Sequence, residues 1–159
     1  EITDFSQKIQ TNHELEPIIR HGEPPAILRF EDVKQEILGI FSIISSFKKS
    51  GYTSLGIVCK TETQARELSE SLRVHTGDIH FLSNQSSAFM KGIIVTSSHM
   101  AKGLEFDEVI VPYVNAKNYN SAIDKSMLYV AVTRAMHRLT LTYNGRPSEF
   151  IPVSSDQNF

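Results

Sequence analysis

Two short strings in this sequence hold residue types that suit contact with a phosphorylated ligand. Lys102 and Glu105 belong to HMAKGLEFDEVIV (99–111), and Arg134 belongs to MLYVAVTRAMHRL (127–139). Cationic side chains that hydrogen-bond phosphate oxygens form some of the stronger polar contacts in proteins. However, the sequence contains no phosphate-cradling loop of the form GxxxxGK followed by Ser or Thr. The residues therefore predict one half of a nucleotide-dependent machine.

Composition narrows the class of protein. The 159 residues are 40% hydrophobic and 21% charged, which is typical of one globular domain with a real core. The net charge of -2 gives no global basic field, so any nucleic-acid contact must be local. The single cysteine, Cys59, excludes an internal disulfide and agrees with a reducing interior.

Targeting signals are also missing from the sequence. No apolar run is long enough to span a membrane, and EITDFSQKIQ at the start does not resemble a secretion signal, so we expect a cytoplasmic location. The absence of an initial methionine in an apparent helix suggests a fragment cut from a longer protein.

Apolar bursts alternate with amphipathic stretches, which predicts an α/β domain with an open, mostly parallel sheet of about six strands. The expected strands are AILRF (26–30), SLGIVCK (54–60), DIHFLS (78–83), GIIVTS (92–97), EVIVPYV (108–114) and LTLTY (139–143). The expected helices are 2–9, 31–49, one capped by Thr61, and 124–136. We expect one domain over 1–153, with a loop at NQSSAFMKG (84–92) and a frayed polar tail at 154–159.

The pattern also predicts which side chains are buried. The helix over 31–49 should bury Val33, Ile37, Ile40, Phe41 and Ile44, and the helix after Thr61 should bury Ala65, Leu68 and Leu72. The continuous run Ile93 to Val95 is typical of a strand covered on both faces. The alternation in LTLTY suggests an edge strand.

Ligands of open parallel sheets bind beyond the carboxyl ends of the strands. Lys60 directly follows one expected strand, and His99, Lys102, Gly103 and Glu105 follow another. Arg134 falls inside an expected helix, so its placement at the same edge is a weaker inference.

At this point the residues carry a family resemblance. TSSHMAKGLEF (96–106) and YVAVTRA (129–135) resemble the fifth and sixth motifs of superfamily 1 helicases of the UvrD/Rep/PcrA type. IVCKTETQAR (57–66) resembles the fourth motif, and PSEFI (147–151) resembles the phrase that closes the domain. The chain thus resembles the second RecA-like domain of such a helicase, a three-layer fold related to P-loop NTPases but without its own P-loop. It also resembles HelD-like proteins, helicase relatives that associate with RNA polymerase.

The resemblance implies roles for single residues. Arg134 would be the arginine finger that reaches the γ-phosphate of ATP, and Lys60 would add positive charge near that phosphate. Lys102 would do the same or help couple the phosphate to nucleic acid. Glu105 would accept from the ribose hydroxyl, Gly103 would permit close backbone approach, and His99 would touch single-stranded DNA. Magnesium would be held mainly by ATP and the N-terminal RecA-like domain, so no metal site is expected in this chain.

The sequence departs from the family at three places. One is AIDKSMLYV (122–130), where the family usually has consecutive glutamates and arginines, so some internal ion pairing is altered. Cys59 and Lys60 stand where the fourth motif has tyrosine and arginine, which puts adenine stacking and a second γ-phosphate contact in doubt. The large insertion between the fourth and fifth motifs is missing, because only His75 to Gly92 separates them.

Each of these residues could instead have a purely structural role. Lys60 could be a simple strand-end charge, His99 a capping or core residue, and Arg134 a structural arginine; Lys102 and Glu105 could be a solvated surface pair.

Three functions stay open. The favoured one is half of an ATP-driven DNA helicase or translocase, an ATP hydrolase that would be inactive as the isolated chain. The second is an ATP-driven module that remodels RNA polymerase without unwinding. The third is a flavodoxin-like or dinucleotide-binding domain, which lacks the expected GxGxxG and leaves YVAVTRA unexplained.

Overall fold

The computed structural model describes residues 24–83 and 91–152. The expected helix at 2–9, the loop from 84 to 90, the boundary at 153 and the polar tail at 154–159 lie outside these residues.

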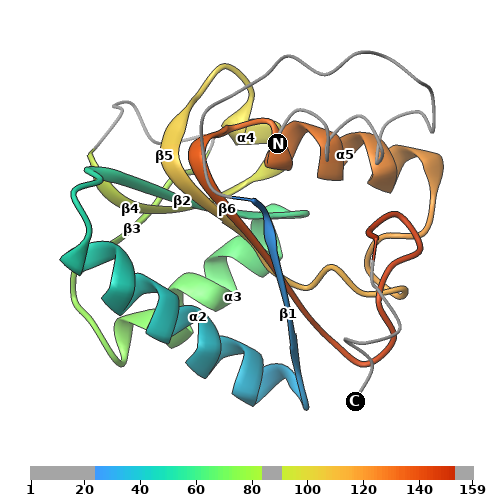
Figure 1. Cartoon of the computed structure of the whole chain (residues 1–159), viewed down its shortest axis with the longest axis horizontal. Helices are drawn as coiled ribbons and strands as arrows, with labels where there is room; N and C mark the ends of the chain where they lie inside the picture. Colours follow the sequence, from blue (N-terminus) through green and yellow to red (C-terminus); the bar gives the residue numbers. More distant parts are fainter. Residues whose placement is uncertain (1–23, 84–90, 153–159) are drawn as a thin grey trace.

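Six parallel strands form one sheet in the order β1-β6-β5-β2-β4-β3 (Figure 1). The strands are β1 (Ala26–Phe30), β2 (Ser54–Cys59), β3 (Ile79–Phe81), β4 (Gly92–Ser97), β5 (Phe106–Val111) and β6 (Ala135–Asn144). The helices are α2 (Val33–Lys49), α3 (Glu62–Arg73), α4 (Ser98–Ala101) and α5 (Ala122–Val132). This architecture confirms the predicted α/β class and the parallel sheet of six strands.

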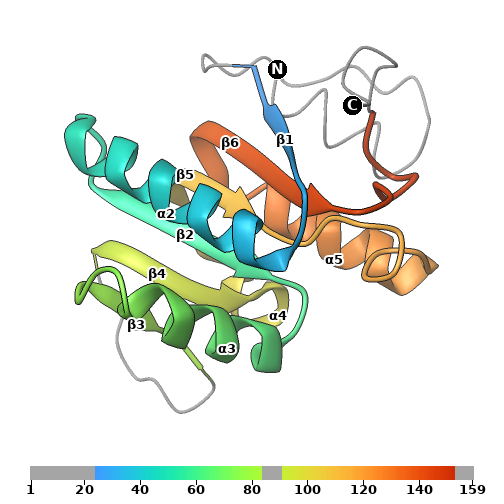
Figure 2. The same ribbon diagram turned by 90° about the horizontal axis from the view of Figure 1, so that it is seen from below.

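Three layers result, because α2 and α3 cover one face of the sheet and α4 and α5 cover the other (Figures 1 and 2). Successive side chains of a strand point to opposite faces, so each central strand contributes to two hydrophobic cores. In β4, Ile94 packs into the core under α5, whereas Ile93 and Val95 pack into the core under α2 and α3. The expectation of a strand covered on both faces is therefore confirmed.

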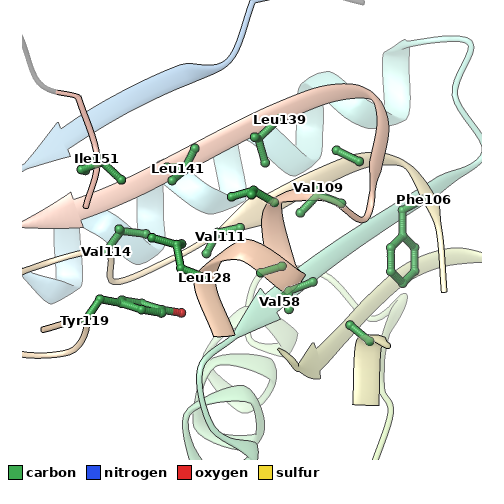
Figure 3. Close-up of a cluster of buried hydrophobic side chains, with 14 of the residues drawn as sticks. Val58, Phe106, Val109, Val111, Val114, Tyr119, Leu128, Leu139, Leu141 and Ile151 are labelled. Atoms are coloured by element: carbon green, nitrogen blue, oxygen red, sulfur yellow. The ribbon is translucent and has the colours of Figure 1, made fainter. Parts of the chain in front are cut away.

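The core between the sheet and α5 contains residues from four strands and two helices (Figure 3). Leu128 of α5 lies among Val58 of β2, Val111 of β5 and Leu141 of β6. Phe106 lies against Gly56, whose position has no room for a side chain because an added Cβ would stand 2.5 Å from the Phe106 ring. These contacts fix α5 along the sheet.

The last strand is not an edge strand. β6 lies between β1 and β5, and the edge strands of the described sheet are β1 and β3. The alternation in LTLTY misled the prediction because Thr140 and Thr142 are buried although they are polar. The Thr142 hydroxyl donates to the carboxylate of Glu36 at 2.6 Å, which satisfies it inside the fold.

The buried side of α2 also differs from the expectation. Val33 is 51% exposed, whereas Glu36 one turn later is fully buried. Glu36 accepts from the Tyr113 amide at 2.8 Å and from Asn144 Nδ2 at 2.7 Å, in addition to Thr142. A carboxylate with three donors can replace an apolar side chain in the core because its polar atoms are satisfied.

Other predicted boundaries are close. α3 begins with a capping box in which Thr61 and Gln64 bond each other's backbone amides, and Ala65, Leu68 and Leu72 are buried as expected. β5 begins two residues before the expected Glu108 and ends at Val111, since Pro112 has no N–H for the ladder. In 24–83 and 91–152, every helix is too short or too polar to cross a bilayer.

Candidate functional site

Arg134 lies just beyond the end of α5, not inside it. A capping box of Ser121 and Asp124 starts the helix at Ala122, and Thr133 is the C-cap residue after Val132. The helix expected over 124–136 is therefore wrong at both ends. β6 begins at Ala135, so Arg134 is the residue that connects helix and strand.

This connection lies at the amino edge of the sheet. β5 and β6 are parallel, and the Phe106 amide that begins β5 donates to the carbonyl of Arg134 at 2.9 Å. Glu105, directly before Phe106, lies at the same edge. The expectation that these residues meet at the carboxyl edge is wrong, because the segment after α4 runs back along the sheet before β5 begins.

The Arg134 guanidinium is held by neutral oxygens. Nε donates to the carbonyl of Val130 at 3.1 Å, Nη1 to the carbonyl of Leu104 at 3.3 Å, and Nη2 to the Thr133 hydroxyl at 3.4 Å. These bonds orient the planar fork without neutralising its charge, and the side chain is only half-buried. The group is thus oriented and still able to meet an anion.

The segment that contacts Arg134 carries three of the other predicted residues. Lys102, Gly103 and Glu105 are exposed, and they flank Leu104, whose carbonyl accepts from Arg134. Gly103 has φ of 81°, a left-handed conformation that favours glycine. The turn therefore depends on this glycine and brings Arg134 close to Leu104 and Glu105.

A small pocket of about 220 Å³ lies between α4 and α5. Its lining combines His99 and Lys102 with apolar side chains of α5, together with two serines; these residues are Ser98, His99, Lys102, Ile123, Ser126, Met127 and Val130. Val130, which lines the pocket, also accepts from Arg134 through its carbonyl.

Lys60 stands apart from Arg134, although its carbonyl accepts from the hydroxyl of Ser98, which lines the pocket, at 3.3 Å. It follows β2 at the carboxyl edge, where Nζ donates to the carbonyl of Asn118 at 2.6 Å and pairs with Asp124 at 3.2 Å. Asp124 is at the start of α5 and Arg134 is just past its end. Eleven residues of helix span roughly 16 Å, so Lys60 and Arg134 do not converge on one point in this structure.

Asp124 was not predicted as a site residue. Burial alone would raise the pKa of Asp124, but donors from the Asn120 and Ser121 amides and from Lys60 outweigh burial and lower the pKa to about 2. The pattern Ser-x-x-Asp at 121–124 is a capping signal that could have located the start of α5. The pairing with Lys60, far away in the sequence, had no local signal.

Other candidate groups are less suited to chemistry. Cys59 is fully buried, and burial, followed by the nearby charge of Glu36, raises the pKa of its thiol well above the ordinary value. Such a cysteine is inert. Within residues 24–83 and 91–152, no group of three or more His, Cys, Asp or Glu side chains is placed to hold a metal ion.

Comparison with known proteins gives one family match. Residues 92–142 match the family described as UvrD-like helicase C-terminal domain. This stretch contains every predicted site residue except Lys60. No curated protein matches the chain.

Solved structures share the fold. The C-terminal domain of a possible DNA helicase from Lactobacillus plantarum WCFS1 is 27% identical, with a TM-score of 0.82 over 98% of this chain and 92% of that one. The arterivirus nonstructural protein 10 helicase in complex with DNA is 13% identical, with a TM-score of 0.52 over 80% of this chain and 32% of that one. The UvsW helicase from bacteriophage T4 is 10% identical, with a TM-score of 0.53 over 74% of this chain and 46% of that one.

The two more distant structures show likeness of fold alone, and this chain spans less than half of each. The Lactobacillus domain matches almost end to end. Together with the family match over 92–142, it makes this chain similar to UvrD-like helicase C-terminal domains.

Proposed function

We propose that this chain is the second motor domain of an ATP-dependent DNA helicase or translocase, in which Arg134 acts as the arginine finger. The observation that carries the proposal is the state of Arg134: three bonds to neutral oxygens orient its guanidinium, and the side chain stays accessible. A fixed cation aimed at a transferring phosphoryl group stabilises the charge that develops in the transition state.

Neighbouring residues supply the rest of the proposed nucleotide contact. Lys102 brings a second positive charge, and Glu105 is an exposed carboxylate that can accept from a ribose hydroxyl. Gly103 leaves open space where a Cβ would stand, so a ligand can approach the backbone there. These residues suit contacts with the γ-phosphate and the ribose of an ATP that is bound elsewhere. The phosphate loop that would hold that ATP is not in this sequence.

The remaining parts of the reaction are assigned to a partner domain. A phosphate loop and acidic magnesium ligands would come from an N-terminal RecA-like domain, since the described part of this chain offers no cluster of metal ligands. When bound, Mg²⁺ would supply positive charge that offsets the negative charge developing during phosphoryl transfer. Closure of the two domains on ATP, and reopening after hydrolysis, would move the protein along nucleic acid.

Single-stranded DNA is the nucleic acid along which we propose that the protein moves. His99 is exposed on α4, beside Lys102 at the pocket between α4 and α5. A local positive site next to apolar side chains suits a phosphate and a base, even in a chain with a net charge of -2. Among proteins of similar fold, the arterivirus helicase and a Sulfolobus solfataricus SWI2/SNF2 ATPase core were both solved with DNA.

Substitution of Arg134 in the intact protein tests the proposal. Arg134→Ala should lower ATP hydrolysis at least a hundredfold, with little change in the dissociation constant for ATP, because the lost contact acts mainly in the transition state. Arg134→Lys should recover only part of the rate, since lysine lacks the planar fork. Hydrolysis within a few fold of wild type in Arg134→Ala would remove the finger assignment.

A duplex-unwinding assay on the same intact protein separates a helicase from a polymerase-remodelling module. Nucleotide-dependent release from RNA polymerase without unwinding would overturn the helicase proposal in favour of remodelling. The cytoplasmic location stays a prediction.

A further inference from the structure

Beyond the carboxyl ends of β2 and β5, polar side chains of the protein bond one another, beside a pocket of about 590 Å³ that Gln64 and Asn118 also line. After β2 the chain enters α3 on one face of the sheet, and after β5 it leads to α5 on the other face. Open α/β sheets bind their ligands at such a point of divergence. Here Lys60, Gln64, Asn118 and Asp124 bond one another, and we call these four residues the carboxyl-edge network.

Asn118 is at the centre of the network. Its carbonyl accepts from Lys60 Nζ at 2.6 Å, and its Oδ1 accepts from Gln64 Nε2 at 2.8 Å. Its Nδ2 donates to the carbonyl of Tyr113 at 3.0 Å. The network therefore ties the segment after β5 to the end of β2 and to the first turn of α3.

Asp124 connects the network to α5. Its Oδ2 accepts from the amides of Asn120 and Ser121 at 3.0 and 3.1 Å, which caps the first turn of the helix. Its Oδ1 accepts from Lys60 at 3.2 Å. The side chains of Lys60 and Asp124 are only 19% and 14% exposed, so the pair is far better shielded from solvent than a surface ion pair.

Arg134 lies directly after the opposite end of α5. Leu128, Ala131 and Val132 are buried against the sheet, so the helix transmits a shift of its first turn to its last as one body. Thr133 caps that last turn, and Arg134 follows it. The position of the guanidinium thus depends on where the first turn is held.

We propose that Lys60 and Asp124 form a positioning pair that sets α5, and through it Arg134, and that Lys60 does not bind the γ-phosphate. The proposal rests on the function proposed for Arg134. It replaces the phosphate contact that the family resemblance implies for position 60. A lysine whose ammonium already has a carboxylate and a carbonyl as partners would have to break both bonds to reach a phosphate.

Steady-state ATP hydrolysis by the intact protein tests the pair. Lys60→Met and Asp124→Asn should each lower kcat on the order of tenfold, less than the roughly 10²-fold that a 1 Å misplacement can cost, while KM for ATP stays unchanged. The double variant should be no slower than either single variant, because both remove the same interaction. Lys60→Arg should keep kcat and KM, since arginine can also pair with Asp124.

A phosphate ligand at position 60 would give a different pattern. Lys60→Met would then raise KM or the dissociation constant for ATP, and Asp124→Asn would leave kcat as it was; either result overturns the positioning pair. Losses of kcat that multiply in the double variant would also contradict it.

Controls separate this inference from unfolding and from the proposed function. Lys48→Met breaks the exposed pair between Lys48 and Asp78, remote from α5, and should change kcat less than twofold. Each variant is compared at a temperature well below its measured Tm; if Asp124→Asn does not fold, Lys60→Met and Lys60→Arg decide the question alone. Normal hydrolysis in Arg134→Ala would reject the proposed function, whereas its loss together with normal Lys60→Met kinetics would reject only the positioning pair.

Discussion

Among the residues of the candidate site, Gly103 has a backbone conformation that favours glycine. Its φ of 81° is strained for any L side chain, although open space surrounds the position. Gly103→Ala should therefore lower the free energy of unfolding by about 1 to 2 kcal/mol through backbone strain alone, as measured by urea unfolding of the purified chain.

Gly51→Ala is the matched control for this prediction. Gly51 also has nothing within 4 Å of an added Cβ, but its φ is not positive. Its substitution should leave stability unchanged or slightly raised. An equal loss in both variants would show that the left-handed turn at Gly103 is not the cause.

At the residue scale, motif strings named most residues of the candidate site. His99, Lys102, Gly103, Glu105 and Arg134 could be named because their neighbours in the sequence form recognisable strings. The partner of Lys60 could not be named, since Asp124 is 64 positions away and only the folded sheet brings the two together. The buried Glu36 was missed for the same reason, as its donors lie 77 to 108 positions away.

At the element scale, α2 is joined to the carboxyl ends of β5 and β6 by Glu36. Glu36→Ala would leave three donors without their acceptor, from Tyr113, Thr142 and Asn144. Thr142 is buried, whereas Tyr113 and Asn144 are half-buried; a buried donor left unsatisfied costs about 1 to 3 kcal/mol, so the variant should lose at least about 1 kcal/mol in urea unfolding.

A surface glutamate provides the comparison for Glu36. Glu70 is exposed on α3, and Glu70→Ala should change stability by less than about 0.5 kcal/mol. Glu36→Gln, which keeps one acceptor oxygen, should fall between the two. A loss of under about 1 kcal/mol in Glu36→Ala would mean that the carboxylate does not join these elements.

Element types followed from periodicity more reliably than element positions. The continuous apolar run in β4 correctly indicated burial on both faces, because covering helices leave no polar side. The alternation in β6 indicated an edge wrongly, because buried threonines were satisfied by a carboxylate from another element. Such compensation depends on tertiary contacts that a sequence pattern does not contain.

At the scale of the whole molecule, the proposed function divides the nucleotide site between this domain and a partner. The sequence holds no phosphate loop, and under this proposal Arg134, Lys102 and Glu105 contact a nucleotide that the partner domain holds. The purified chain should hydrolyse ATP far more slowly than the roughly 1 to 10³ per second of typical enzymes. Phosphate release at rates typical of an intact motor, unaffected by Arg134→Ala, would contradict the division of the site between two domains.

Under the proposed function, Arg134 stabilises the transition state of phosphoryl transfer on ATP held by a partner domain. The most direct measurement compares the affinity of the intact protein for Mg²⁺·ATP with its affinity for Mg²⁺·ADP and aluminium fluoride, which mimics that transition state. Arg134→Ala should weaken binding of the mimic by at least about a hundredfold while ATP binding changes little. Equal binding of the mimic by wild type and Arg134→Ala would contradict the account.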